Sequence, residues 1–168
     1  MSDLNQEVTH DEDTQKGKFL SFSVDEETFG LEIRYVTEII GVQQITSIPD
    51  VPGYIKGVIN LRGKIIPVID VRIKFKKSPI AYTDRTCIIV INTGEVTAGL
   101  IVDHVAEVVT IHDENIVPPP DQRIGIDNVY IQGVGKLEEQ VILLLECNKL
   151  LNEKESNKMN ELSTEASK

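Results

Sequence analysis

The chain has 168 residues, 40% of them hydrophobic, enough for one compact unit with a single sizeable core or two small cores that share a wall. Its formal net charge of −10 argues against nonspecific binding to nucleic acid or to an anionic membrane, because phosphate binding is driven by cations. No segment offers the roughly 20 consecutive apolar residues of a membrane span, and the N-terminus lacks the apolar core of a secretory signal. We therefore expect a cytoplasmic protein.

The N-terminal part predicts a β-hairpin. In "FLSFSV" the apolar residues alternate and place Leu20, Phe22 and Val24 on one face, and "FGLEI" repeats the alternation after the acidic turn "DEET". "IRYVTEI" follows and predicts a turn or a short helix. Residues 1–16 carry five acids against one lysine and have little to bury, so we expect an acidic, disordered tail.

The rest of the body is a succession of short runs rich in Val and Ile, several of them apolar on both faces. They are "KIIPVIDV", "CIIVI", "AGLIVDHV", "EVVTI", "VYIQGVG" and "QVILLLE". Strands of this kind need cover on both sides, which favours two small barrels or curved sheets pressed together. Pro67 removes a ladder donor, so its strand should lie at an edge or carry a bulge there.

The C-terminal part predicts one short helix. "LLECNKLLNEKES" has apolar residues at helical spacing, so the helix should begin near Glu146 and pass into a polar tail, 155–168, that we expect to be disordered. Three consecutive prolines, 118–120, predict a stiff extended crossing before the last strands.

A search for catalytic or metal-binding groups finds only weak candidates. Asp70 and Asp103 each follow an apolar run, and an enzyme would need them to converge with His104. Carboxylates at strand ends more often bond turn amides, which is the better interpretation. Cys87 and Cys147 lack CxxC spacing and are expected to be reduced and partly buried. The sequence contains no P-loop, dinucleotide fingerprint or nucleophile elbow, and we predict no metal and no cofactor.

One block of the chain reverses the overall charge. Between residues 54 and 85, eight basic residues stand against Asp70 and Asp84, namely Lys56, Arg62, Lys64, Arg72, Lys74, Lys76, Lys77 and Arg85. Such a block can meet an acidic partner, or it can be a solvated lysine-rich loop. Both interpretations stay open at this point.

The segment "GVINLRGKIIPVIDVRIKF", preceded by "FGLEIRYVTEIIG" and "IPDVPGYIKG" and followed by "GLIVDHVAEVV", resembles CheW, the coupling protein family of bacterial chemotaxis. The resemblance covers about residues 17–151 and implies one CheW-like domain over 17–154. It implies a mainly β fold of two SH3-like five-stranded barrels that share a hydrophobic interface, with no reaction of its own. It also implies two partners, the cytoplasmic signalling domain of a chemoreceptor and the regulatory domain of the histidine kinase CheA. The protein would be monomeric in isolation and recruited to membrane receptor arrays.

The resemblance also implies two binding surfaces. Arg62 would be presented on a fixed hairpin between Gly57 and Gly63, with Glu38 as its intramolecular partner or as a neighbour in the same patch. The receptor surface would be a groove for a helical hairpin, assigned to Glu38, Ile39, Leu61, Arg62, Cys87, Ile89 and Gly99. The kinase surface would use apolar barrel ends, assigned to Leu20, Ile33, Val36 and Gly57.

Two other functions remain open. The chain could be a paralogous coupling protein that serves a non-chemotactic receptor array. It could also be a small-barrel nucleic-acid-binding protein, suggested by the basic block, in which case a salt-sensitive gel shift is expected.

Overall fold

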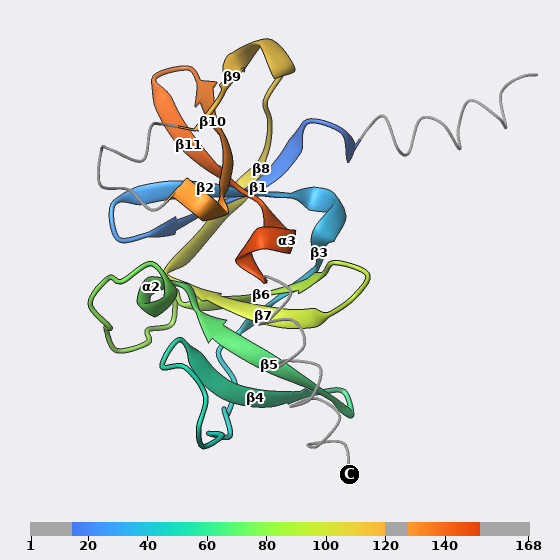
Figure 1. The fold of residues 1–168 in the computed structure, drawn as a ribbon, viewed down its shortest axis with the longest axis vertical. Helices are drawn as coiled ribbons and strands as arrows, with labels where there is room; N and C mark the ends of the chain where they lie inside the picture. The colour runs from blue at the N-terminus through green and yellow to red at the C-terminus, as the bar shows by residue number, and fades with distance from the viewer. Residues whose placement is uncertain (1–14, 120–127, 152–168) are drawn as a thin grey trace, which may run out of the picture.

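The computed structural model describes residues 15–119 and 128–151. The two tails expected to be disordered lie outside these ranges except for residues 15 and 16, and the last proline of the triplet also lies outside them. Within them, the chain forms two β-sheets, drawn one above the other in Figure 1, with small helices at their margins. The prediction of a mainly β fold with two packed sheets is confirmed.

The upper sheet has six strands in the order β8-β1-β2-β11-β10-β9. The predicted N-terminal hairpin is its centre, with Phe22 opposite Phe29 and the left-handed Asp25 (φ 57°) in the turn. All neighbours are antiparallel except β11 and β2. The strands are β1 Lys18–Val24, β2 Glu27–Glu32, β8 His104–Thr110, β9 Ile116–Val117, β10 Ile131–Leu137 and β11 Gln140–Leu145.

The lower sheet has five strands in the order β3-β6-β7-β5-β4. They are β3 Val36–Gly41, β4 Ile55–Leu61, β5 Lys64–Asp70, β6 Cys87–Asn92 and β7 Thr97–Val102. The outer strands β3 and β4 share no ladder, but Thr46, a few residues beyond β3, exchanges two backbone hydrogen bonds of 2.9 Å with Val58 of β4. We call the gap between β3 and β4 the seam.

Buried side chains gather in three clusters that follow this arrangement. The shared core contains residues of both sheets, among them Phe22 and Leu31 from the upper sheet and Ile89 and Leu100 from the lower. Each sheet also encloses an inner core on its other face: the lower inner core includes Ile59, Ile66 and Ile88, and the upper one includes Phe19, Val109 and Ile142. Strands apolar on both faces therefore have cover on both sides, as the sequence predicted.

The helical segments that the structure describes in full are all short. They are η1 Ile33–Tyr35, α2 Val71–Lys74, η2 Asp113–Asn115, η4 Asn128–Tyr130 and α3 Cys147–Leu150. The C-terminal helix begins where predicted, because the Glu146 carboxylate accepts from the Asn148 N–H at 3.2 Å as its N-cap. Only the first three residues of "IRYVTEI" are helical, and the rest is strand β3.

Two strand predictions were wrong in detail. β5 lies inside its sheet without a bulge at Pro67, and this is possible because its parallel pairing with β7 begins only at Val68. "AGLIVDHV" is not one strand but two, since the chain crosses from β7 to β8 at Asp103, whose N–H donates to Ser23 O at 3.1 Å.

The strand count of the upper sheet also differs from the five implied by the resemblance, because the two residues of β9 add a sixth strand. In the described ranges, no helix is long and apolar enough to cross a membrane.

Candidate protein-binding site at the seam of the five-stranded sheet

The turn between β4 and β5 presents Arg62 in an unusual backbone conformation. Leu61 pairs with Lys64, so the loop has two residues, and both have positive φ, 52° for Arg62 and 86° for Gly63. The Asn60 side-chain oxygen accepts from the Gly63 N–H at 2.7 Å and fixes the turn. Such turns prefer Asn or Gly at both positions, because side chains with a Cβ are strained there. An arginine at this point therefore costs backbone free energy.

The Arg62 guanidinium crosses the seam and donates to the carboxylate of Glu38 on β3. The hydrogen bond that Arg62 donates to this carboxylate, and then the carboxylate's charge, raise the pKa of Arg62, so the side chain stays cationic. The Arg62 side chain is nevertheless 71% exposed, and exposed ion pairs contribute little to stability. The predicted Glu38–Arg62 pair is present, and its stabilisation does not explain why arginine occupies a strained position.

The edge strand β3 and its neighbour β6 carry other predicted residues on the opposite face of the sheet. Ile39 pairs with Ile89 and is 43% exposed, and Cys87 is partly buried against the shared core. Val36, predicted for the kinase surface, packs against the same core and so lies with them. Leu61 instead packs partly on the lower inner core, on the Arg62 side of the seam. The structure thus places these side chains on the two outer strands and on β6, and divides them between the two faces of the sheet.

Four predicted residues lie inside the fold and present no side chain to a partner. Leu20 and Ile89 are 3% and 0% exposed, as members of the shared core. A Cβ on Gly99 would lie 2.7 Å from Ile88, and a Cβ on Gly57 would lie 2.0 Å from the Thr46 oxygen. Both glycines permit close packing, and Gly57 (φ 146°) has the positive φ that the sequence suggested. Ile33, in η1, packs partly against the shared core.

Sequence reasoning missed an ionic cluster that joins the two sheets. Arg72 of α2 is 6% exposed, and it pairs with Asp103 (2.6 Å) and with Asp25 of the β1–β2 turn (2.7 Å). Burial lowers its pKa, but the hydrogen bonds and charges of Asp25 and Asp103 raise the pKa overall. Lys77 pairs with Glu27 beside this cluster. No sequence signal connects residues so far apart in the chain.

The basic block is therefore not one continuous positive surface. Besides Arg72 and Lys77, Lys74 is 7% exposed, with its Nζ 4.0 Å from the ring centre of Tyr54. Five cations of the block stay exposed, namely Lys56, Arg62, Lys64, Lys76 and Arg85. The question whether the block is an interaction surface or a solvated loop therefore concerns only these five side chains.

The candidate carboxylates have structural partners. Asp70 caps α2 by accepting from the Ile73 N–H, and it also accepts from the Tyr82 hydroxyl at 2.9 Å. Burial is the main cause that raises the pKa of Tyr82, and the hydrogen bond to Asp70 is the second. Asp103 accepts from Arg72 and from the Asp25 N–H. The structural interpretation of both aspartates is confirmed.

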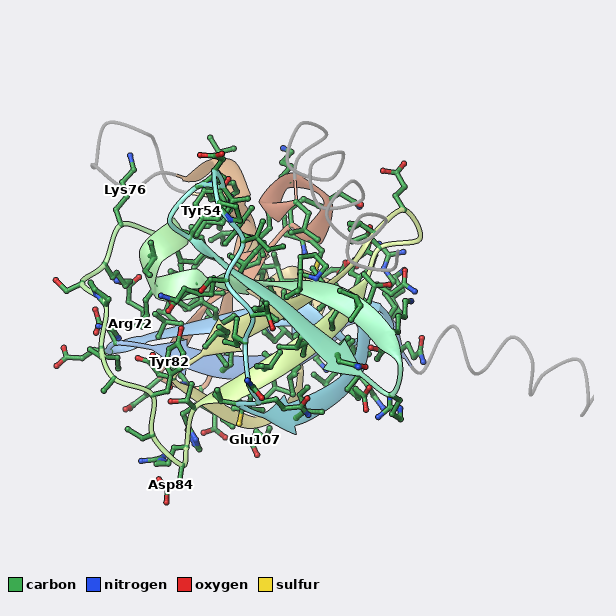
Figure 2. All side chains as sticks on the ribbon, turned by 90° about the horizontal axis from the view of Figure 1, so that it is seen from below. Tyr54, Arg72, Lys76, Tyr82, Asp84 and Glu107 are labelled. Carbon is green, nitrogen blue, oxygen red and sulfur yellow. The ribbon has the colours of Figure 1, made fainter. Side chains whose placement is uncertain are left out.

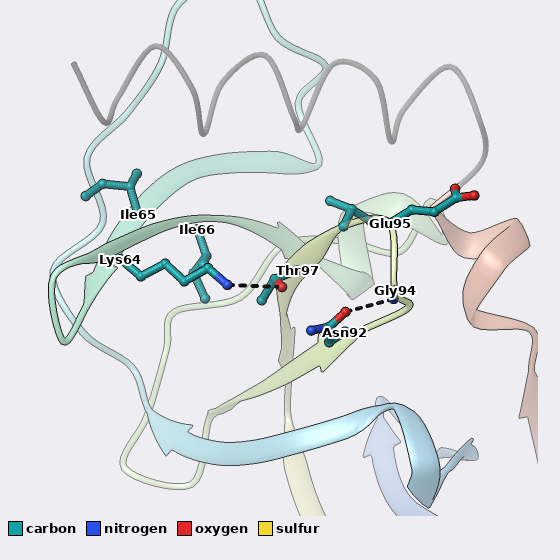
Figure 3. A pocket seen from close by; sticks show the side chains of 8 residues that line it. Lys64, Ile65, Ile66, Asn92, Gly94, Glu95 and Thr97 are labelled. Carbon is teal, nitrogen blue, oxygen red and sulfur yellow. Dashed lines mark hydrogen bonds between the residues drawn. The ribbon is translucent and has the colours of Figure 1, made fainter.

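Other chemistry-bearing groups are also held in the fold. Burial raises the pKa of the Cys147 thiol to about 12. A pocket of about 240 Å³ lies beside the Arg62 turn, and Figure 3 shows that Lys64 donates to Thr97 there while the Gly94 N–H donates to Asn92. In the described ranges, no three His, Cys, Asp or Glu side chains gather as metal ligands.

The seam thus has the features of a protein-binding site: an exposed cation on a fixed turn, its carboxylate partner, and an apolar side chain on the same edge strand. A family model described as "CheW-like domain" matches residues 18–155. The chain therefore belongs to the CheW-like domain family, and the resemblance seen in the sequence is confirmed.

Named relatives agree with this assignment. The chain is 39% identical over 138 residues to "Chemotaxis protein CheW" of Klebsiella aerogenes, which covers 82% of this chain and 83% of the relative. It is 30% identical over 138 residues to "Protein FrzA" of Myxococcus xanthus, covering 80% and 84%. The crystal structure of the scaffolding protein TtCheW from Thermoanaerobacter tengcongensis matches with a TM-score of 0.73 and 39% identity, covering 77% of this chain and 88% of that chain.

Proposed function

We propose that this chain is a non-enzymatic adaptor that couples the cytoplasmic signalling tips of chemoreceptors to the histidine kinase CheA. The observation that carries the proposal is Arg62, an exposed cation kept on a strained turn where its ion pair adds little stability. Membership of the CheW-like family and the similarity to a scaffolding protein support it. In this proposal the chain acts in the cytoplasm and is recruited to membrane receptor arrays.

The receptor surface of this proposal is the seam between the two outer strands of the five-stranded sheet. Arg62 and Glu38 supply a charged pair, and Ile39 (43% exposed) supplies an apolar contact. Cys87 and Val36 are partly exposed on the same face as Ile39 and would border the contact. A helical hairpin can present apolar side chains to such an edge and carboxylates to Arg62.

The charge of Glu38 gives the direct test of this surface. Glu38→Lys should weaken binding to a receptor signalling domain by about tenfold or more, because it places a second cation beside Arg62 and removes a carboxylate from the contact. Isothermal titration of the purified proteins measures this. Glu114→Lys, which makes the same charge change on an exposed residue of η2, is the matched control. Equal binding by the Glu38 variant and the control would remove the seam from the receptor surface.

The similarity to FrzA keeps a second function in view. That relative has a different name from the chemotaxis proteins and is nearly as similar to this chain as several of them. The same adaptor mechanism could then serve a receptor array outside chemotaxis. Titrating the chain against receptor signalling domains from each array of its own organism distinguishes the two.

A further inference from the structure

The five-stranded sheet opens beside the Arg62 turn, between the neighbouring strands β5 and β7. β5 begins at Lys64 and β7 at Thr97, but the two strands pair only from Val68 and Gly99 onward. The first four residues of β5 therefore form no ladder with β7. We call this opening the fork. The pocket of about 240 Å³ lies in the fork, because Lys64 and Thr97 line it from the two strands.

Both walls of the fork are fixed by hydrogen bonds within their own hairpins. In the β4–β5 turn, the Gly63 N–H donates to the Asn60 side chain at 2.7 Å. In the β6–β7 turn, the Gly94 N–H donates to the Asn92 side chain at 2.8 Å. Pro67 has no N–H with which to continue the ladder, which favours the separation of β5 from β7 at this point. The fork is therefore preorganised, which lowers the entropy lost when a partner binds.

The fork contains hydrogen-bond donors that the fold itself does not use. The Lys64 Nζ donates to Thr97 Oγ1 at 3.5 Å, a long contact that leaves two of its three N–H groups for a ligand. Among the residues that the structure describes, Lys64 has no acidic partner. The Asn92 side-chain oxygen accepts from Gly94, and within the same described ranges its NH2 group donates to no acceptor. Both side chains line the pocket, so a bound group would meet an ammonium donor and an amide donor.

The remaining lining of the pocket suits a short hydrocarbon stem that ends in a carboxylate. Ile66 and Val96 are 1% and 4% exposed and supply apolar lining. One acid, Glu95, also lines the pocket, but Figure 3 shows its carboxylate pointing away from Lys64. An ammonium beside apolar surface, with the acid of the lining turned away from it, favours a carboxylate as the ligand.

Lys64 differs in this respect from Lys76, an exposed lysine beyond the other end of β5. Figure 2 shows the Lys76 side chain pointing away from the body of the molecule, whereas Figure 3 shows the Lys64 side chain lying along the pocket toward Thr97. Lys64 is also continuous with the proposed receptor surface, because only Gly63 separates it from Arg62. Arg62 reaches across the seam to β3, and Lys64 reaches across the fork to β7. The two cations thus leave one turn toward opposite sides of the β4–β5 hairpin.

We propose that the fork is a second subsite of the receptor surface, in which Lys64 and Asn92 bind a carboxylate of the receptor's signalling tip. The inference rests on the proposed adaptor function and adds a contact to it. This carboxylate differs from any that meets Arg62, because the two cations point to opposite sides of the hairpin. An acidic residue on a helical tip can reach the fork while a neighbouring part of the tip contacts the seam, since both lie at the Arg62 turn. Lys64 then selects among receptors by the charge that they place at this position.

The test is an isothermal titration of the full chain with a receptor signalling domain of its own organism. Lys64→Gln keeps most of the side-chain length and removes the charge, so binding should weaken by about three- to tenfold with an unchanged melting temperature. Lys76→Gln makes the same change at an exposed position outside the fork and should bind as the wild type does. The loss in the Lys64 variant should shrink as the salt concentration is raised, because the substitution removes an electrostatic contact.

Charge reversal identifies the carboxylate. Lys64→Glu should weaken binding further than Lys64→Gln does, because it brings two acids together. Each acidic residue of the receptor tip is then changed to lysine in turn. One of these receptor variants should bind the Lys64→Glu chain about tenfold or more tightly than the wild-type receptor does, and the same variant should not restore binding to Arg62→Glu.

The outcomes separate this inference from the proposed function. A wild-type chain that binds no receptor signalling domain of its organism would contradict the adaptor function and this inference with it. Wild-type binding that Lys64→Gln and Lys76→Gln leave equally strong would overturn the subsite and leave the adaptor function standing. A Lys64→Gln variant with weaker binding and a lower melting temperature, together with no receptor variant that compensates Lys64→Glu, would also overturn it, since Lys64 would then be structural.

Discussion

Arg62 is the residue at which stability and recognition are most clearly opposed. Its backbone conformation suits glycine, while its side chain is largely exposed and paired with Glu38. A side chain kept against backbone preference, with little stability in return, is expected where a partner needs it.

Replacing this arginine by glycine separates the two roles. Arg62→Gly should leave the melting temperature unchanged or raise it by a few degrees, because the strain is relieved and only an exposed ion pair is lost. Binding to the receptor signalling domain should fall by about tenfold or more. Calorimetric melting and a binding titration measure the two effects.

Lys56→Ala, which removes an exposed cation from strand β4 next to the Arg62 turn, is the control for general charge loss. A marked fall in the melting temperature of Arg62→Gly, with normal binding by the folded fraction, would show that the arginine is structural.

At the scale of single residues, the sequence predicted the ion pair of Arg62 and Glu38 but not which other predicted side chains are buried. Arg62 and Glu38 could be paired from residue type and the family resemblance. Burial could not be predicted for Leu20 and Ile89, because strands apolar on both faces do not show which side chains reach the surface. Arg72 was seen only as one cation of a basic block, since its partners lie on distant turns.

Among the elements, β4 depends most on one glycine. Gly57 lies beside the Thr46–Val58 bridge, the backbone contact that spans the seam, and any Cβ there would collide with Thr46 O. Its importance to any binding surface is therefore indirect, through the shape of the sheet edge.

Gly57→Ala should lower the free energy of unfolding by at least about 2 kcal/mol. The new methyl group must displace the backbone of residue 46, and alanine is also strained at the positive φ of residue 57. Chemical denaturation measures this. Gly41→Ala is the control, because that glycine is also on an outer strand but has no atom within 4 Å of an added Cβ. Equal losses of stability in the two variants would show that the close approach of residue 57 to Thr46 does not matter for the free energy of unfolding.

Element boundaries were predictable where a local signal marks them. The hairpin turn and the C-terminal helix have such signals in "DEET" and in the cap Glu146. The end of β5 and the crossing from β7 to β8 have no such local signal. Asp70 and Asp103 mark these points through hydrogen bonds from Tyr82 and Arg72, which come close only in the folded chain. The tolerance of Pro67 inside a sheet likewise depends on where β7 starts to pair.

On the scale of the whole molecule, the two sheets are joined by the shared core and by the Arg72 cluster. The core is hydrophobic and non-directional, whereas Arg72 bonds turns of both sheets and the loop of residues 75–86 between α2 and β6 at defined geometry. Arg72 is thus the side chain that fixes the loop relative to both sheets.

Arg72→Met should lower the free energy of unfolding by about 1–3 kcal/mol, because it leaves the Ser78 carbonyl without this donor and removes the cation that pairs with Asp25 and Asp103. Hydrogen exchange should speed up in residues 75–86 more than in β10 and β11. Arg85→Met, the same change at an exposed position, should alter neither measurement. Unchanged exchange in the loop of the Arg72 variant would show that the loop is held by other contacts.

The central claim is that one chain holds two partners at once, through separate surfaces. The direct measurement is the mass of the complex formed when the chain is mixed with a receptor signalling domain and the kinase regulatory domain, measured by light scattering after size exclusion. The account predicts a three-component complex that disappears when this chain is left out. It also predicts that Arg62→Gly loses only the receptor domain and keeps the kinase domain. Displacement of one partner by the other, with no three-component species at any ratio, would contradict the account.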